Sequence, residues 1–139
     1  MTAQSSSSPL KSICHCGAIE VIVPYAPKEI NECQCTLCRR YGAAWIYYKP
    51  EEVTINKHKA GDVKKYIWGD RDISFNFCDN CGCMCFWYPE RDSITEIGVN
   101  SRNMDPEDLK HITRKISFDI AGAPLRDQAT AHPQDRARY

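Results

Sequence analysis

Cysteines gathered in three short clusters constrain the fold of this chain more than any other feature. The chain has nine cysteines in 139 residues, and all of them lie in the segments 14–16, 33–38 and 78–85. Zinc accepts thiolates at about 2.3 Å and is tetrahedral in structural sites, so closely spaced cysteines from two segments complete a site economically. A metal that joins distant segments also adds folding free energy that a small β domain otherwise lacks. We therefore expect a fold organised around bound metal.

The composition argues against a secreted disulfide scaffold and against several classes of partner. The cysteine count is odd, and residues 1–12 show neither the apolar segment of a secretory signal nor the arginines of a mitochondrial transit peptide. We expect a cytoplasmic protein, because the reducing cytosol keeps thiols available for metal. Basic and acidic residues number 18 each, so the formal charge is zero and we expect neither nucleic acid nor a membrane as a partner. The sequence leaves a homo-oligomer open.

The rest of the chain predicts a mainly β domain built of short strands. Runs of β-branched and aromatic residues end at prolines or glycines, which is typical of strands. One short helix is expected over residues 106–110, because Asp105 can cap it and Pro106 suits its first turn. The expected strands cover 19–23, 43–49, 52–56, 66–68, 73–77, 84–88, 94–99 and 115–120. The expected domain organisation is a disordered segment over 1–12, a zinc-binding domain over 13–120 and a tail over 121–139.

Four cysteines from two clusters suit a closed, structural zinc site. Cys14 and Cys16 form one pair, and Cys78 and Cys81 form the other. Two pairs about sixty residues apart would join the first strand to a central hairpin. His15 could replace a sulfur, although a residue between two ligands usually points away from the metal.

The three cysteines Cys33, Cys35 and Cys38 suit a different kind of site. Three protein ligands with a fourth position left for water or substrate are typical of catalytic zinc. Cys83 or Cys85 could supply a fourth sulfur and close the site, and an iron–sulfur cluster is a minor alternative. The sequence therefore predicts two zinc ions per chain, with the second site open to a ligand.

Two arginines follow the last of these three cysteines directly. Zinc with three thiolates carries a net charge of −1, and an incoming thiolate makes it −2, so nearby cations are favourable. Arg39 and Arg40 could offset this charge or hold a carboxylate of a substrate.

The chain carries a series of short motifs in a fixed order: Cys14-x-Cys16-Gly17, Cys33-x-Cys35-x-x-Cys38-Arg39 with Gly42-Ala43, Phe77-Cys78-x-x-Cys81-Gly82, and later Gly98-Val99-Asn100 and Asp105-Pro106. This order resembles the glutathione-dependent formaldehyde-activating enzyme family, which shares its domain with centromere protein V. The resemblance covers about residues 12–120. It implies a compact fold of the β-tent type, with twisted antiparallel sheets around two zinc ions.

The resemblance also implies a reaction, in which glutathione as co-substrate combines with formaldehyde to give S-(hydroxymethyl)glutathione; in reverse this is a carbon–sulfur lyase reaction. It assigns the structural zinc to the closed set of four cysteines and the catalytic zinc to the set of three. One departure is the cysteine at position 83, where the family commonly has a small hydroxyl residue.

Three functions are compatible with this sequence. The leading hypothesis is a zinc enzyme that adds the glutathione thiolate to a small carbonyl such as formaldehyde. The second keeps glutathione but uses a larger electrophile, as a lyase, dehalogenase or isomerase. The third is a zinc-stabilised binding module or a glutathione carrier without catalysis.

Overall fold

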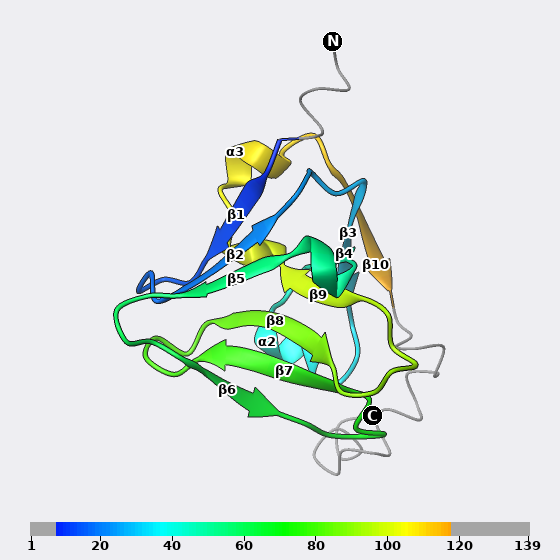
Figure 1. Ribbon diagram of the computed structural model, residues 1–139. Coiled ribbons are helices and arrows are strands. Elements are labelled where there is room, and N and C mark those ends of the chain that lie inside the picture. Colours follow the sequence, from blue (N-terminus) through cyan, green and yellow to red (C-terminus); the bar gives the residue numbers. More distant parts are fainter. Residues whose placement is uncertain (1–7, 118–139) are drawn as a thin grey trace.

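Two β-sheets make up the described part of the protein. The computed structural model describes residues 8–117, and Figure 1 shows a small sheet inclined over a larger one. The small sheet is antiparallel, with the order β1-β2-β5. Its strands are β1 (Leu10–Ile13), β2 (Ile19–Val23) and β5 (Thr54–Lys57). The prediction of a mainly β fold is confirmed.

The larger sheet has seven strands in the order β10-β3-β4-β9-β8-β7-β6. Its strands are β3 (Glu29–Cys33), β4 (Trp45–Tyr48), β6 (Val63–Tyr66), β7 (Ile73–Cys78), β8 (Met84–Pro89), β9 (Ile97–Asn100) and β10 (Thr113–Ser117). Strand β10 runs parallel to β3, whereas the other pairs in the sheet are antiparallel. Short helical segments connect the strands: α2 (Cys38–Tyr41), α3 (Pro106–Leu109), η1 (Pro50–Glu52) and η2 (Ser101–Asn103).

The two faces of the larger sheet have different surroundings. Because side chains alternate along a strand, neighbours such as Trp45 and Ile46 on β4 lie on opposite faces. Ile46 packs in a core that includes Val21 of the small sheet, so this inner face holds the two sheets together. Trp45 belongs to a second cluster, which contains Cys33 and Phe75. This cluster covers the other side of the sheet, which we call the outer face.

Three elements differ from the sequence prediction. Strand β1 begins at Leu10, so residues 10–12 are not disordered; Ser12 is buried and its hydroxyl donates to the Asn100 carbonyl at 2.9 Å. Strand β3 was not predicted because its sequence is half polar, and it forms between β4 and β10. Helix α2 was predicted as a loop; its last turn ends at Gly42, whose φ of +67° favours glycine.

Several boundaries also move. Strand β6 covers 63–66 rather than 66–68, and β10 begins at Thr113 rather than at residue 115; residues 118–120 of that predicted strand lie outside the described residues. Residues 1–7 and 118–139, which include the predicted tail, lie outside the described residues. The predicted helix near 106–110 is present as α3, and Asp105 caps it by accepting from the Glu107 amide.

Candidate metal centres

The four cysteines of the predicted closed site lie together. Their sulfur atoms are all within 4.8 Å of one another, with 3.7 Å between Cys14 and Cys16 and 3.6 Å between Cys16 and Cys78. Four thiolates bound tetrahedrally at about 2.3 Å from zinc lie about 3.8 Å apart. A disulfide would need about 2.05 Å. The spacing therefore fits one zinc ion, with Cys81 as the fourth ligand, and not a disulfide.

Tight turns place these four sulfurs at the same point. Cys14 and Cys16 lie between β1 and β2, and Cys78 ends β7 just before the turn into β8. The Ile19 amide donates to the Cys14 sulfur at 3.2 Å, and the Asn80 amide donates to the Cys78 sulfur at 3.4 Å. Amide donors of this kind stabilise charge on a thiolate. The cluster thus joins a hairpin of the small sheet to a hairpin of the large one.

The histidine between the first two cysteines is not part of this group. His15 is exposed, and the group of ligands within reach of one ion contains sulfur alone. The alternative in which a histidine replaces a sulfur is therefore not supported by the geometry.

The second set of three cysteines also lies together, on the outer face. Cys33 ends β3, Cys35 follows in the loop, and Cys38 begins α2; their sulfurs are within 4.8 Å of one another. All three side chains are buried, with at most 4% exposed. The Cys38 amide donates to the Cys35 sulfur at 3.2 Å, and the Trp45 indole N–H donates to the Cys38 sulfur at 3.3 Å. We call this group the three-sulfur cluster.

Hydrogen bonds among the three thiols give them different pKa values. The bond with Cys35, followed by the bond with Cys38, lowers the pKa of Cys33 to about 3. The bond to Cys33 raises the pKa of Cys35 to about 11, and the same partner raises the pKa of Cys38. One thiolate is therefore stabilised by two neighbouring thiols. A divalent metal that binds all three sulfurs must displace the remaining protons, so its affinity falls as the pH falls.

Two buried polar atoms beside this cluster lack a hydrogen-bond partner. Within residues 8–117 they are the Thr36 hydroxyl, between Cys35 and Cys38, and the Asn31 side-chain oxygen, two residues before Cys33. Buried polar groups are nearly always paired, so such orphans often mark the place of a bound group. The donor set and these orphans fit a zinc ion whose three protein ligands leave a fourth position for a further molecule.

Aromatic rings surround the three-sulfur cluster. The Phe75 ring lies between those of Tyr41 and Trp45, at centroid distances of 5.9 and 6.1 Å. Trp68 and Trp87 pack at the margin of the same cluster and are partly exposed. These rings limit the access of water to the sulfurs and leave an apolar rim.

Cys83 and Cys85 do not close the open site. Neither belongs to the group that could hold the second ion. Cys85 packs with Cys14 and Cys78 on the inner face, and its thiol donates to the Cys83 carbonyl at 3.3 Å. Burial raises the pKa of Cys85 to about 12, and charge on Cys14 adds to this effect. Both extra cysteines therefore accompany the four-sulfur site.

The two arginines predicted to hold a substrate lie on α2. Arg40 is exposed, and its guanidinium donates to the Thr36 carbonyl at 2.7 Å, which supports the loop between Cys35 and Cys38. Arg39 is half-buried. Their role toward a substrate carboxylate stays a prediction.

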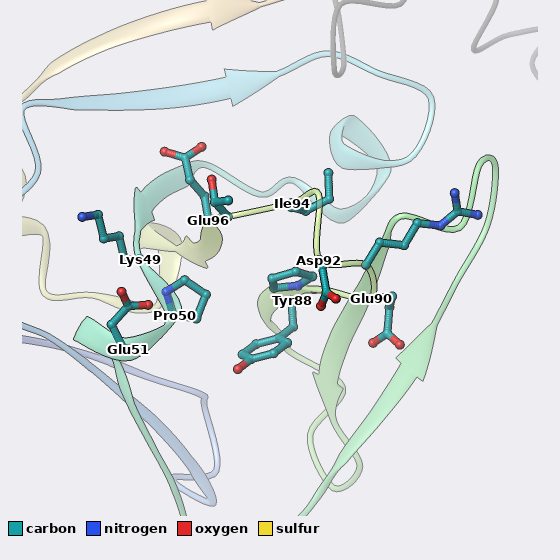
Figure 2. A pocket seen from close by; sticks show the side chains of 11 residues that line it. Lys49, Pro50, Glu51, Tyr88, Glu90, Asp92, Ile94 and Glu96 are labelled. Atoms are coloured by element: carbon teal, nitrogen blue, oxygen red, sulfur yellow. The ribbon is translucent and has the colours of Figure 1, made fainter.

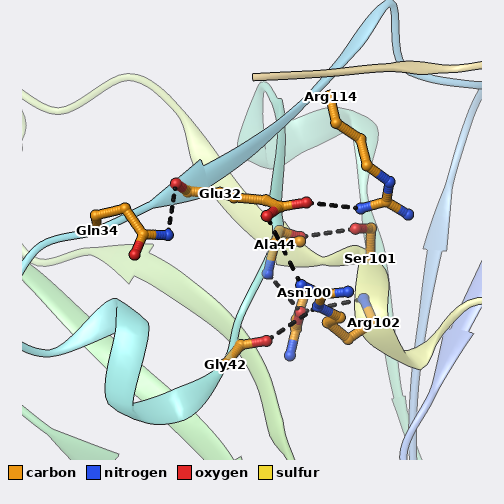
Figure 3. Close-up of polar contacts among 8 residues, drawn as sticks. All are labelled: Glu32, Gln34, Gly42, Ala44, Asn100, Ser101, Arg102 and Arg114. Atoms are coloured by element: carbon orange, nitrogen blue, oxygen red, sulfur yellow. Dashed lines mark hydrogen bonds and ion pairs between the residues drawn. The ribbon is translucent and has the colours of Figure 1, made fainter. Parts of the chain in front are cut away.

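A polar network behind α2 fixes the position of this helix. The Arg102 side chain donates to the Gly42 carbonyl at 3.1 Å, and Arg114 pairs with Glu32 at 3.3 Å (Figure 3). Arg102 also lies 4.0 Å from Glu32. Because Glu32 directly precedes Cys33, the network links β10 and η2 to the strand that carries the first ligand of the three-sulfur cluster.

A surface pocket of about 740 Å³ lies elsewhere, between η1 and the segment that joins β8 to β9 (Figure 2). No cysteine lines it. The side chains around it include Glu51, Glu90, Asp92 and Glu96, with only Lys49 and Arg91 as cations. This acidic lining would repel a ligand with two carboxylates, so the pocket does not suit glutathione.

Fold and sites together define a two-sheet β protein with two cysteine clusters, one of four sulfurs and one of three, that could each hold a metal ion. The family described as glutathione-dependent formaldehyde-activating enzyme matches residues 9–118, and the chain belongs to this family. The match confirms the family resemblance seen in the motifs and points to a glutathione-related, zinc-binding function. No curated protein matches the chain.

A solved structure supports the same fold. The crystal structure of a Rhodobacter sphaeroides protein, a structural genomics target, is 28% identical with a TM-score of 0.61. The similarity covers 76% of this chain and 100% of that one. Among residues 8–117 there is no helix with the length and apolar character needed to cross a membrane.

Proposed function

We propose that this protein is a zinc-dependent enzyme that adds the thiolate of glutathione to a small carbonyl such as formaldehyde. The observation that carries the proposal is the buried three-sulfur cluster, which offers a metal three ligands where the other site offers four. A bound zinc ion would keep the thiol of glutathione ionised at neutral pH. We also propose a cytoplasmic location, where reduced glutathione is the main thiol pool.

The residues around the cluster suit the handling of a thiolate. The Trp45 indole and the Cys38 amide donate to sulfur, so they offset negative charge when all thiols are ionised. The surrounding rings exclude water, which strengthens these interactions. Arg39 and Arg40 directly follow Cys38 in α2 and are candidates for holding the carboxylates of glutathione.

The proposal is tested by removing ligands of the open site alone. We expect Cys35→Ser and Cys38→Ser to lower turnover with glutathione and formaldehyde by about 100-fold or more. Mutating a residue that only hydrogen-bonds a metal ligand already lowers metal affinity or activity by about 10–100-fold, and these cysteines are ligands themselves. Cys83→Ser is the matched control, because this thiol lies outside the three-sulfur cluster. If these variants bind glutathione and turn over as well as the parent, the three-sulfur cluster is not the reactive site.

The uncatalysed reaction must be separated from catalysis, because thiols add to formaldehyde without an enzyme. A rate above background that rises in proportion to enzyme concentration excludes a carrier that only binds glutathione. A rate that stays at background, together with stoichiometric glutathione binding, would instead establish the carrier.

The aromatic rings at the margin of the three-sulfur cluster favour a second class of electrophile. Partly exposed rings such as Trp68 and Trp87 border the cluster, and formaldehyde has no surface for them to contact. A larger, planar electrophile would bury these rings. Turnover of an aromatic aldehyde or a quinone compared with formaldehyde distinguishes the two; strong formaldehyde turnover with no other activity removes the second.

A further inference from the structure

Tyr47 and Asn31 lie on the same face of the sheet as the three-sulfur cluster. Asn31 pairs with Trp45 in the register of β3 and β4, so Asn31, Cys33, Trp45 and Tyr47 all project from the outer face. Along β3, Asn31 and Cys33 are separated by one same-face step of about 7 Å. Tyr47 is partly exposed, with 37% of its surface open to solvent. Its hydroxyl contacts the side chain of Asn31, which lies one same-face step from Cys33 on β3.

A hydrogen bond fixes the hydroxyl of Tyr47 and leaves its proton uncommitted. The Asn31 side-chain nitrogen donates to the Tyr47 oxygen at 2.5 Å. The Asn31 side-chain oxygen is one of the buried orphans described above. The pair thus combines one O–H donor with one buried acceptor that has no partner. An alcohol oxygen, which accepts one hydrogen bond and donates another, is the complement of this arrangement.

The ring of Tyr47 is held in place by Trp87. The two ring centroids are 6.0 Å apart. Trp87 lies across Gly98, where an added Cβ would come within 1.9 Å of the indole nitrogen. Because β9 has no side chain at that position, the indole can cross it and reach the ring on β4. The absence of a side chain at this glycine thus gives Tyr47 a rigid neighbour.

The hydroxyl is also within electrostatic reach of the cluster. Burial raises the pKa of Tyr47 to about 12, and charges on Cys33 and Cys38 act in the same direction, although the bond from Asn31 opposes them. The phenol therefore stays protonated at neutral pH and can donate.

We propose that Tyr47, held by Asn31, is a catalytic residue that binds the carbonyl oxygen of the electrophile and protonates it as the thiolate adds. This inference rests on the proposed function. A bond forms between sulfur and the carbonyl carbon, and the C–O π pair moves to oxygen. That oxygen takes the Tyr47 proton, which solvent water replaces at the exposed edge of the ring. The new hydroxyl then accepts from Tyr47 and donates to the Asn31 oxygen.

Kinetics of Tyr47→Phe test the role in the reaction. We expect kcat to fall by about 100-fold, the lower range for a lost general acid, with the glutathione KM and the melting temperature unchanged. Tyr88→Phe is the matched control, since Tyr88 is 39% exposed on β8, which β9 separates from β4, and its ring packs against Phe86 instead. Equal kcat in the two variants overturns the inference, whereas absent turnover in the parent protein overturns the proposed function.

A binding measurement on the zinc-loaded protein gives a second readout that needs no turnover. S-(2-hydroxyethyl)glutathione carries a hydroxyl that S-ethylglutathione lacks. We expect the parent and Tyr88→Phe to prefer the hydroxyl analogue by about 2-fold to 10-fold, the worth of one hydrogen bond, and Tyr47→Phe to lose the preference. Equal affinities in the parent, or a preference kept in Tyr47→Phe, contradict the inference. If the parent binds glutathione but neither analogue, the hydroxyl contact is absent and the inference fails; if it does not bind glutathione either, the proposed glutathione site is wrong.

Discussion

A single indole N–H donates directly to a sulfur of the three-sulfur cluster. Trp45 is 1% exposed and donates to Cys38 across 3.3 Å. Donors to a ligand sulfur delocalise its charge and orient it, and such outer contacts are commonly as important as the ligands themselves. The sequence placed Trp45 in the expected strand over 43–49 and gave no sign of its contact with a cysteine. Its contact arises because α2 returns the chain from β3 to β4, a turn that local propensity did not show.

Trp45→Phe should therefore weaken the binding of metal at the three-sulfur cluster. We expect zinc in the three-sulfur cluster to transfer to a chelator about 10-fold more readily, because one donor to sulfur is lost. Ile46→Val is the control for general packing loss, since Ile46 is buried on the inner face and the change costs about 1 kcal/mol. Chelator competition followed by absorbance measures the transfer. Equal release from the two variants would show that the indole does not act on the metal.

The two cysteine clusters differ in which secondary-structure elements they join. The four-sulfur site joins hairpins from two sheets, whereas the three-sulfur cluster lies within one continuous segment between β3 and α2. Cross-linking distant segments restricts the unfolded chain more than cross-linking near ones. The closed site should therefore contribute more to stability than the open one.

Matched cysteine substitutions test this division. We expect Cys81→Ser to lower the free energy of unfolding by several kcal/mol, because structural zinc contributes about 10 kcal/mol or more of apparent binding free energy in small domains. Cys38→Ser should lower turnover by about 100-fold or more while keeping most of the stability. Denaturant melts of both variants give the comparison. A larger loss in Cys38→Ser would reverse the assignment of the structural and reactive sites.

The small sheet carries a carboxylate whose ionisation supports the fold. Glu20 on β2 accepts from Asn56 on β5 at 3.0 Å and from His58 at 3.2 Å, and it lies 3.6 Å from Lys11 on β1. The bond from Asn56, followed by that from His58, lowers the pKa of Glu20. A lowered carboxyl pKa stabilises the folded state above the unfolded value, near 4.3 for glutamate, and this contribution disappears as the pH falls through the folded value.

Glu20→Gln should consequently weaken the dependence of the free energy of unfolding on pH in the acidic range. We expect the variant to be less stable than the parent at neutral pH, with the difference shrinking as the pH falls below about 4. Glu51→Gln, at an exposed position in η1, serves as the control. Urea melts across this pH range measure the effect. A difference that stays constant with pH would mean that the charge of Glu20 is irrelevant to stability.

For the whole molecule, spacing of cysteines predicted which sulfurs lie together, while the environment of each group came only from the fold. Short pairs such as Cys14 and Cys16 fix their own geometry, so a motif is sufficient to group them. Strand β3 and its parallel pairing with β10 depend on neighbours far along the chain, and a half-polar segment gives no local sign of them. For the same reason the sequence could not show that Cys83 and Cys85 lie on the other side of the sheet from the open site.

The most direct test of the account is a titration of the metal-free protein with cobalt(II), with and without glutathione, followed by thiolate-to-cobalt charge-transfer absorption. We expect two ions per chain. The absorption of one ion should correspond to four thiolates and should not change when glutathione is added. The absorption of the other ion should change to that of a site with one further sulfur ligand when glutathione is added. Saturation at one ion, or a second ion whose absorption glutathione leaves unchanged, would contradict an open thiol-binding site at the three-sulfur cluster.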